Sequence, residues 1–193
     1  MDEAAAPSAR AKGFAAPVSP DTLVAFALLV AGAIVFLWYA PASYQIFLAL
    51  HVLAVIIWVG GDITLTTLGI VFEQKQDGPT LAALGRMGTW IGTRVYTPAL
   101  FFVLGFGVAL VEKSGQPWDQ FWIIFGLVGW SLATVIGIGF VGPELGRIDA
   151  AAQQFGPESP EVAQRVKRLF TIFRFDTALL MLIVIDMAAK PTF

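Results

Sequence analysis

The chain contains no cysteine, and His51 is the single histidine among its 193 residues. Without cysteine, the chain cannot form a disulfide framework, a thiolate zinc site, an iron–sulfur cluster or a thiol nucleophile. One histidine also excludes a metal site built from several histidines of the same chain. Haem or metal chemistry that uses an imidazole would therefore depend on His51.

Charged residues are scarce as well. They make up 13% of the sequence, against 57% hydrophobic residues, whereas soluble domains are about 25% charged. This composition predicts a polytopic integral membrane protein with the lipid bilayer as its main partner. The net charge is −2 and the basic residues are scattered, so there is no continuous cationic surface and we predict no nucleic-acid partner.

Five apolar stretches approach the roughly 20 residues that a helix needs to cross a bilayer. They predict an all-α integral membrane protein, a five-helix transmembrane bundle. The Ala-, Pro- and Ser-rich residues 1–20 are expected to form a flexible cytoplasmic tail, and residues 21–193 a single transmembrane domain. The five expected spans are residues 23–39, 44–72, 88–111, 121–141 and 169–189.

Prolines set several of the expected helix ends. Pro41 should stop the first segment, and the pair Gly142-Pro143 should end the fourth. Pro98 lies inside the third segment, where the missing N–H predicts a kink. The polar stretch before the fifth segment is expected to enter the helix from an N-cap near Ser159.

Basic residues concentrate on one side of these five segments, which predicts that this side is cytoplasmic. The N-terminus would then be cytoplasmic and the C-terminus periplasmic or extracellular, in a bacterial inner membrane. The residues that define this side are Arg10, Lys12, Lys75, Arg86, Arg94, Arg147, Arg165, Lys167 and Arg168.

Two ionisable residues interrupt the second segment, His51 toward its outer end and Asp62 deeper. Spacings of seven and eleven residues place His51, Trp58 and Asp62 on one helical face. An ionisable side chain in a bilayer core costs at least about 2.5–3.5 kcal/mol, so each residue needs a partner or a function. His51 and Trp58 are candidate haem- or metal-binding residues, and a hydrogen bond to a neighbouring helix explains His51 equally well.

Further charged residues are expected at the depth of Asp62. Three acidic and three basic groups could form a nearly neutral ion-pair layer that fixes helix register, or they could line a polar pocket for a substrate, a proton or a lipid headgroup. Asp186 is expected nearer the outside, like His51. The predicted polar network consists of Asp62, Arg94, Glu144, Arg147, Arg174 and Asp176.

The pattern Leu50-His51-Val52, then Trp58, then Gly60-Gly61, resembles the first core helix of small bacterial membrane proteins of the CopD/HemJ-like superfamily. The likeness is greatest to an uncharacterised four-helix family of that superfamily and covers about residues 44–189, with one added N-terminal helix. In the HemJ branch, the resemblance implies bound haem b with His51 as the matching histidine. In the copper-resistance branch, it implies copper handling by the same residue.

Three functions remain open from the sequence, and it does not decide whether the chain is an enzyme. The first is haem- or metal-linked membrane redox handling with His51 as ligand. The second is a non-catalytic accessory subunit of a larger membrane complex. The third is a transporter of a small solute or metal ion, in which Asp62 is a proton or cation site and the chain forms a homodimer.

Overall fold

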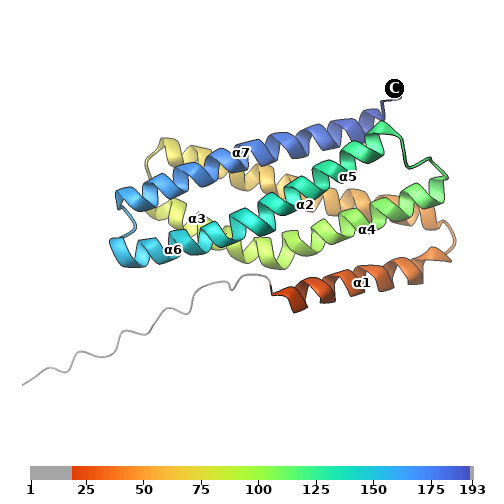
Figure 1. Ribbon diagram of the computed structural model, residues 1–193, viewed down its shortest axis with the longest axis horizontal. Coiled ribbons are helices and arrows are strands. Elements are labelled where there is room, and N and C mark those ends of the chain that lie inside the picture. The colour runs from red at the N-terminus through yellow and green to blue at the C-terminus, as the bar shows by residue number, and fades with distance from the viewer. Residues whose placement is uncertain (1–18, 192–193) are drawn as a thin grey trace, which may run out of the picture.

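The computed structural model describes residues 19–191, which are helical with short connections and contain no strand. The described helices form five rods, as the apolar stretches predicted, because α3, η1 and α4 join end to end and so do α5, η2 and α6. Figure 1 shows the rods lying side by side. All but two residues of the predicted 1–20 tail lie outside the described residues. The elements are α1 (Pro20–Trp38), α2 (Ser43–Gln74), α3 (Gly78–Ile91), η1 (Gly92–Tyr96), α4 (Thr97–Ser114), α5 (Phe121–Thr134), η2 (Val135–Val141), α6 (Gly142–Phe155) and α7 (Pro160–Ala189).

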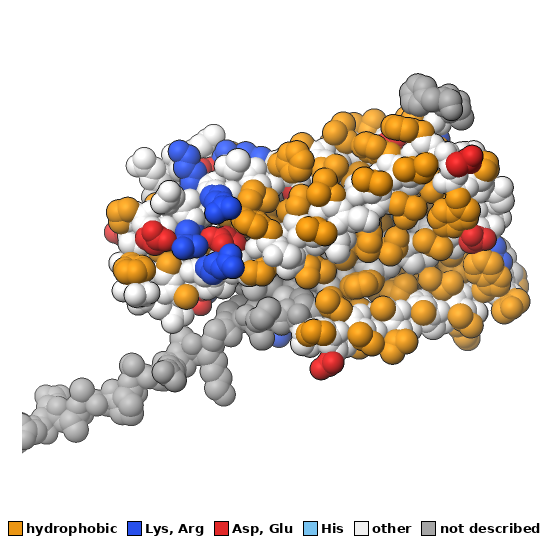
Figure 2. Space-filling model, viewed as in Figure 1, with side chains coloured by type: hydrophobic (Ala, Val, Ile, Leu, Met, Phe, Trp, Pro, Cys, Tyr) orange, Lys and Arg blue, Asp and Glu red, His pale blue; other side chains and the backbone are white. Residues whose placement is uncertain are grey.

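Four of the rods are long and apolar enough to cross a membrane: α1, α2, the α3–α4 rod and the α5–α6 rod. The fifth rod, α7, has 30 residues but carries Arg174, Asp176 and Asp186. We infer that it also spans, because it packs lengthwise against α5 and α2. In Figure 2, hydrophobic side chains cover most of the visible surface and charges gather at the end formed by α3, α6 and the start of α7. This end we call the charged end.

Two predicted boundaries were wrong, and the second concerns a proline. The third rod begins at Gly78 rather than at residue 88, and the fourth continues past Pro143 to Phe155. A π-helical segment precedes each internal proline: η1 ends two residues before Pro98, and η2 ends two residues before Pro143. Bonds spanning five residues replace the usual α-helical bonds there, for example from the Thr97 N–H to the Gly92 carbonyl. The wider turn accommodates the proline, so the rod continues.

Side chains cap two of the polar helix starts. Ser159 accepts a hydrogen bond from the Val162 N–H at 3.4 Å, which confirms the expected N-cap, and α7 begins at Pro160. Asp77 accepts bonds from the Thr80 N–H at 3.0 Å and hydroxyl at 2.6 Å. These bonds lower the pKa of the Asp77 carboxyl below its ordinary value. The connection from α2 to α3 is therefore a tight, capped turn.

Glycines let the rods approach closely. A Cβ atom on Gly69 of α2 would collide with the Phe170 ring of α7. A Cβ on Gly129 of α5 would lie 2.6 Å from the Ile183 side chain. Two points along α7 are thus packed closely, one against α2 and one against α5, as expected for small residues at membrane helix interfaces.

Candidate functional site

A polar contact between side chains of two rods in the apolar region joins α2 and α7. The Thr177 hydroxyl donates a hydrogen bond to Asp62 Oδ2 and lies 3.0 Å from the Thr66 hydroxyl oxygen. Thr177 has one hydroxyl proton, which it can donate fully to only one of these two oxygens at a time. Asp62 and Thr66 are four residues apart and share a face of α2. Both are buried, with 8% and 5% of their surface exposed.

A second carboxyl group lies beside this contact. Asp176 precedes Thr177 on α7, is 6% exposed, and is near enough to Asp62 for the two negative charges to repel. Its Oδ1 atom is buried and has no hydrogen-bond partner among the described residues. No described basic side chain forms an ion pair with either aspartate. We call Asp62, Thr66, Asp176 and Thr177 the acid site.

Apolar layers lie on both sides of the acid site along the bundle. On the side away from the charged end, Val59, Ala133 and Leu180 form a buried cluster where α2, α5 and α7 meet. On the side of the charged end, the Phe170 ring lies against Gly69. These contacts begin within about two helical turns of Asp62 and Asp176. The acid site is therefore enclosed at both ends by hydrophobic side chains.

The π-helical segments lie near the same depth. Tyr96, the last residue of η1, places its ring and hydroxyl against Gly61, directly beside Asp62, and the charge of Asp62 acts on that hydroxyl. The segment η2 contacts α7. Since π-helical turns in membrane helices often mark functional sites, irregular backbone and buried carboxylates coincide in this part of the bundle.

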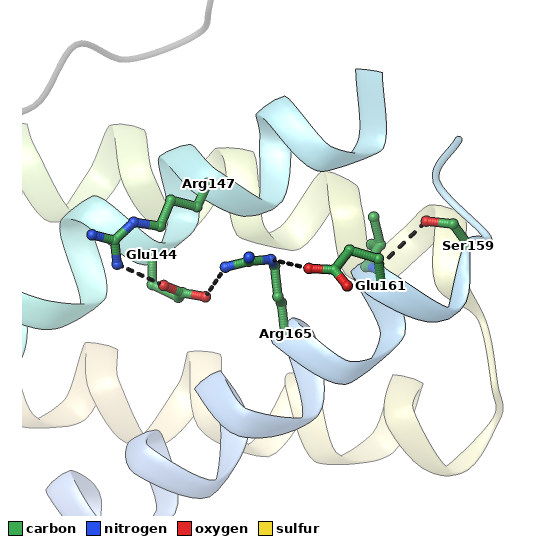
Figure 3. Close-up of polar contacts among 6 residues, drawn as sticks. Glu144, Arg147, Ser159, Glu161 and Arg165 are labelled. Carbon is green, nitrogen blue, oxygen red and sulfur yellow. Dashed lines mark hydrogen bonds and ion pairs between the residues drawn. The ribbon is translucent and has the colours of Figure 1, made fainter. Parts of the chain in front are cut away.

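The remaining predicted network residues do not join the acid site. Glu144, which is 2% exposed, accepts hydrogen bonds at 3.0 Å from both Arg147 and Arg165 at the charged end. Arg165 also donates to Glu161 at 2.9 Å, as Figure 3 shows. The bonds from Arg165 to Glu144 and Glu161 raise the pKa of its guanidinium. Glu144, Glu161 and Arg165 line a pocket of about 210 Å³ together with Gln164 and Arg168.

The other two arginines also have their own contacts. Arg174 forms an ion pair with Glu73 near the end of α2. The Arg94 guanidinium lies 5.0 Å from the centre of the Trp90 ring. The six residues of the predicted network therefore divide into separate contacts, and the single neutral ion-pair layer does not form. Within residues 19–191, Asp62 and Asp176 keep no basic partner.

His51 lies in the N-terminal half of α2, against α4. Its Nδ1 is 2.9 Å from the Val103 carbonyl oxygen, and its ring lies against Gly107. A carbonyl can only accept, so Nδ1 carries the proton and Nε2 keeps a free lone pair. Trp58 lies elsewhere, packed against the cluster around Val59 and Leu180. His51 and Trp58 therefore have different neighbours, although they share a face of α2.

Sequence reasoning found the two aspartates of the acid site and missed the hydroxyl groups. Thr66 could have been found from its four-residue spacing to Asp62 on an apolar helix. The structure also places Tyr96 beside Gly61, a contact that no spacing in the sequence predicts. Nothing in the sequence indicated that Glu73 would be the partner of Arg174.

A comparison with family models matches residues 45–191 to the family described as predicted integral membrane protein (DUF2269), and the chain belongs to this family. The match covers α2 to α7 almost completely and leaves out α1. No curated protein and no solved structure matches the chain.

Proposed function

We propose that this member of the DUF2269 family of integral membrane proteins is a transporter, in which the acid site binds a proton or a small cation that drives or accompanies transport. One observation carries the proposal. Asp62 and Asp176 are both buried where α2 packs against α7, and no described basic residue forms an ion pair with either of them. Such groups are costly inside a membrane and mark ion or proton pathways in many membrane proteins.

The chemistry of the acid site suits this role. Two carboxyl groups and two threonine hydroxyls offer only oxygen atoms, which are the ligands of protons and hard cations. Binding one positive charge would relieve the repulsion between the aspartates and give the unpartnered Oδ1 of Asp176 a partner. Ion binding is therefore expected to lower the free energy of the acid site relative to its empty state.

The arrangement of the rods around the acid site also supports transport. A carrier must hold its ion out of contact with both aqueous sides at one stage, and apolar side chains enclose this acid site at both ends. The segments η1 and η2 interrupt regular α-helix in two rods at this region. Changes in these turns would let one half of a rod move relative to the other.

The test uses purified protein in liposomes that contain a pH-sensitive dye, with proton and sodium fluxes measured in separate runs. We expect a flux in one of the two that falls at least tenfold in Asp62→Asn and in Asp176→Asn. Asp149→Asn, which changes a half-buried aspartate on α6 whose carboxyl group accepts a hydrogen bond from Gln153, is the matched control and should keep the wild-type rate. Fluxes that are equal in all four proteins would refute the proposal.

A second candidate, haem-linked redox handling, rests on His51. Haem-ligating histidines commonly donate Nδ1–H to a carbonyl and bind iron through Nε2, and His51 has this arrangement with Val103. The likeness to the CopD/HemJ-like superfamily would support it. Arg94 and Arg174 would not hold the haem propionates, because Arg174 pairs with Glu73 and Arg94 is nine residues, about 13 Å along the rod, from Val103.

Copper fits His51 less well than haem does. Among the described residues, no group of three or more His, Cys, Asp or Glu side chains gathers to hold a metal ion. The haem candidate is tested by absorption spectra of the native protein and of His51→Ala, each oxidised and then reduced with dithionite. A Soret band that is lost in the variant would support it, and a colourless native protein would refute it.

A further inference from the structure

Besides Asp176, one other buried side chain has a polar atom without a partner. Among the described residues, Oδ1 of Asp176 and Oδ2 of Asp186 are the two buried side-chain atoms that lack a hydrogen-bond partner. Both aspartates lie on α7, and Asp186 is 8% exposed. Ten residues separate them, which is about 15 Å along the helix. A single rod thus carries an unpartnered carboxyl oxygen at the acid site and another toward its C-terminal end.

Among the described residues, no cation forms an ion pair with Asp186. Of the rods packed beside this part of α7, α5 contains no ionisable residue, and the outer half of α2 contributes Tyr44 and His51. His51 is bonded to Val103. On α7 itself, the Lys190 ammonium lies 5.0 Å from the centre of the Trp122 ring instead of pairing with Asp186.

The charged residues at the end of α4 are also engaged elsewhere. Lys113 donates a hydrogen bond to the Trp38 carbonyl at 2.7 Å, and Glu112 accepts one from the Trp118 indole at 2.9 Å. Asp186 is therefore a buried carboxyl group with no described partner for a negative charge. Its position near the C-terminal end of α7 places it close to the aqueous side opposite the charged end.

We propose that Asp186 is the outer protonation site of the transport path, and that the ion bound at the acid site is a proton. The inference rests on the proposed transport function and deepens it. A metal cation needs several oxygen ligands, which the lone carboxyl group of Asp186 does not provide, whereas a proton needs one oxygen. An ion that uses both sites on α7 is therefore a proton.

The transfer conserves protons and charge. A proton from the outer water binds Oδ2 of Asp186 and neutralises it. It then leaves Asp186, which becomes negative again, and binds Oδ1 of Asp176. The two oxygens are too far apart for direct transfer, so water must enter the apolar layer around Leu180 when the rods move. The acid site releases the proton toward the charged end.

The first experiment measures the initial rate of proton uptake into liposomes driven by a potassium diffusion potential. We expect Asp186→Asn to lower the rate at least tenfold and Asp186→Glu, which keeps a carboxyl group, to restore most of it. Glu112→Gln, an exposed acidic residue at the same end, is the matched control and should keep the wild-type rate.

The outcomes separate the two proposals. Loss of flux in Asp62→Asn and Asp176→Asn with a normal rate in Asp186→Asn would overturn the outer protonation site and leave the transport function intact. A sodium flux without a proton flux would overturn the proton as the ion. If the wild-type protein shows no flux of either ion, the transport function itself fails.

A second experiment does not depend on activity. The chain lacks cysteine, so Asp186→Cys introduces a single thiol for labelling. We expect a membrane-impermeant maleimide to label this thiol from the side opposite the charged end and to leave Asp176→Cys unlabelled under the same conditions. Absence of labelling at position 186 in a protein that elutes as a single folded species would show that outer water does not reach this position and would overturn the proposal.

Discussion

Replacing a buried carboxyl group by a carboxamide is expected to destabilise the protein at Glu144 but not at Asp176. Glu144 accepts hydrogen bonds at 3.0 Å from two arginines, and such charged bonds contribute about 1.5–3 kcal/mol each. The side chains of Arg147 and Arg165 are 63% and 36% exposed, so water replaces part of what is lost. We expect Glu144→Gln to lower the free energy of unfolding by about 1–3 kcal/mol.

Asp176 has the opposite surroundings, with an unpartnered oxygen and a second carboxyl group nearby. Asp176→Asn removes the repulsion with Asp62, so its effect should lie between no change and a gain of about 2 kcal/mol. Unfolding by sodium dodecyl sulfate in mixed micelles, followed by circular dichroism at neutral pH, measures both variants. A loss of more than about 1 kcal/mol in Asp176→Asn would refute the reasoning, because such a loss requires a stabilising partner for the carboxylate.

Two further predictions concern the frame of the bundle. Gly69→Ala should destabilise the protein by about 1–3 kcal/mol, because the added Cβ collides with the Phe170 ring. Gly60→Ala, whose Cβ meets no atom within 4 Å, should leave the free energy of unfolding unchanged. Equal effects of the two substitutions in the same unfolding assay would contradict the packing. The stabilisation from the Asp77 cap should be fully present above the ordinary carboxyl pKa of 3.8. It should be lost as the pH falls through the lower pKa that Asp77 has in the folded protein. In the wild type, the protection of the Thr80 amide from hydrogen exchange, relative to its intrinsic exchange rate at each pH, should then fall on acidification. Asp77→Asn should show no such step.

The five rods could be predicted from the sequence because long apolar runs and polar caps are local signals. The continuation of the fourth rod past Gly142-Pro143 could not be predicted, because the rule that proline stops a helix ignores π-helical turns. In η2, the bond from the Gly142 N–H to the Gly137 carbonyl lets the rod pass Pro143. Whether a proline ends or only modifies a helix is decided by such bonds and by packing, neither of which is visible in the sequence.

The acid site could be predicted in part. Asp62 and Asp176 stand out as ionisable residues in apolar runs, and their shared depth follows from counting along the helices. Their separation from Arg174 follows from helix geometry, since residues two apart point about 200° apart and cannot face the same neighbour. Depth alone therefore predicts more ion pairs than form, because the rotation of each helix decides which side chains meet.

The central claim is that the acid site exchanges an ion, and infrared difference spectroscopy of the protein in lipid nanodiscs tests it most directly. Spectra recorded across a pH titration should contain a protonated-carboxyl band that changes with pH and is lost in Asp62→Asn or Asp176→Asn. The same band should persist in Asp149→Asn. A titrating carboxyl band that is identical in the wild type and in both acid-site variants would contradict the account, because the buried aspartates would then take up no proton.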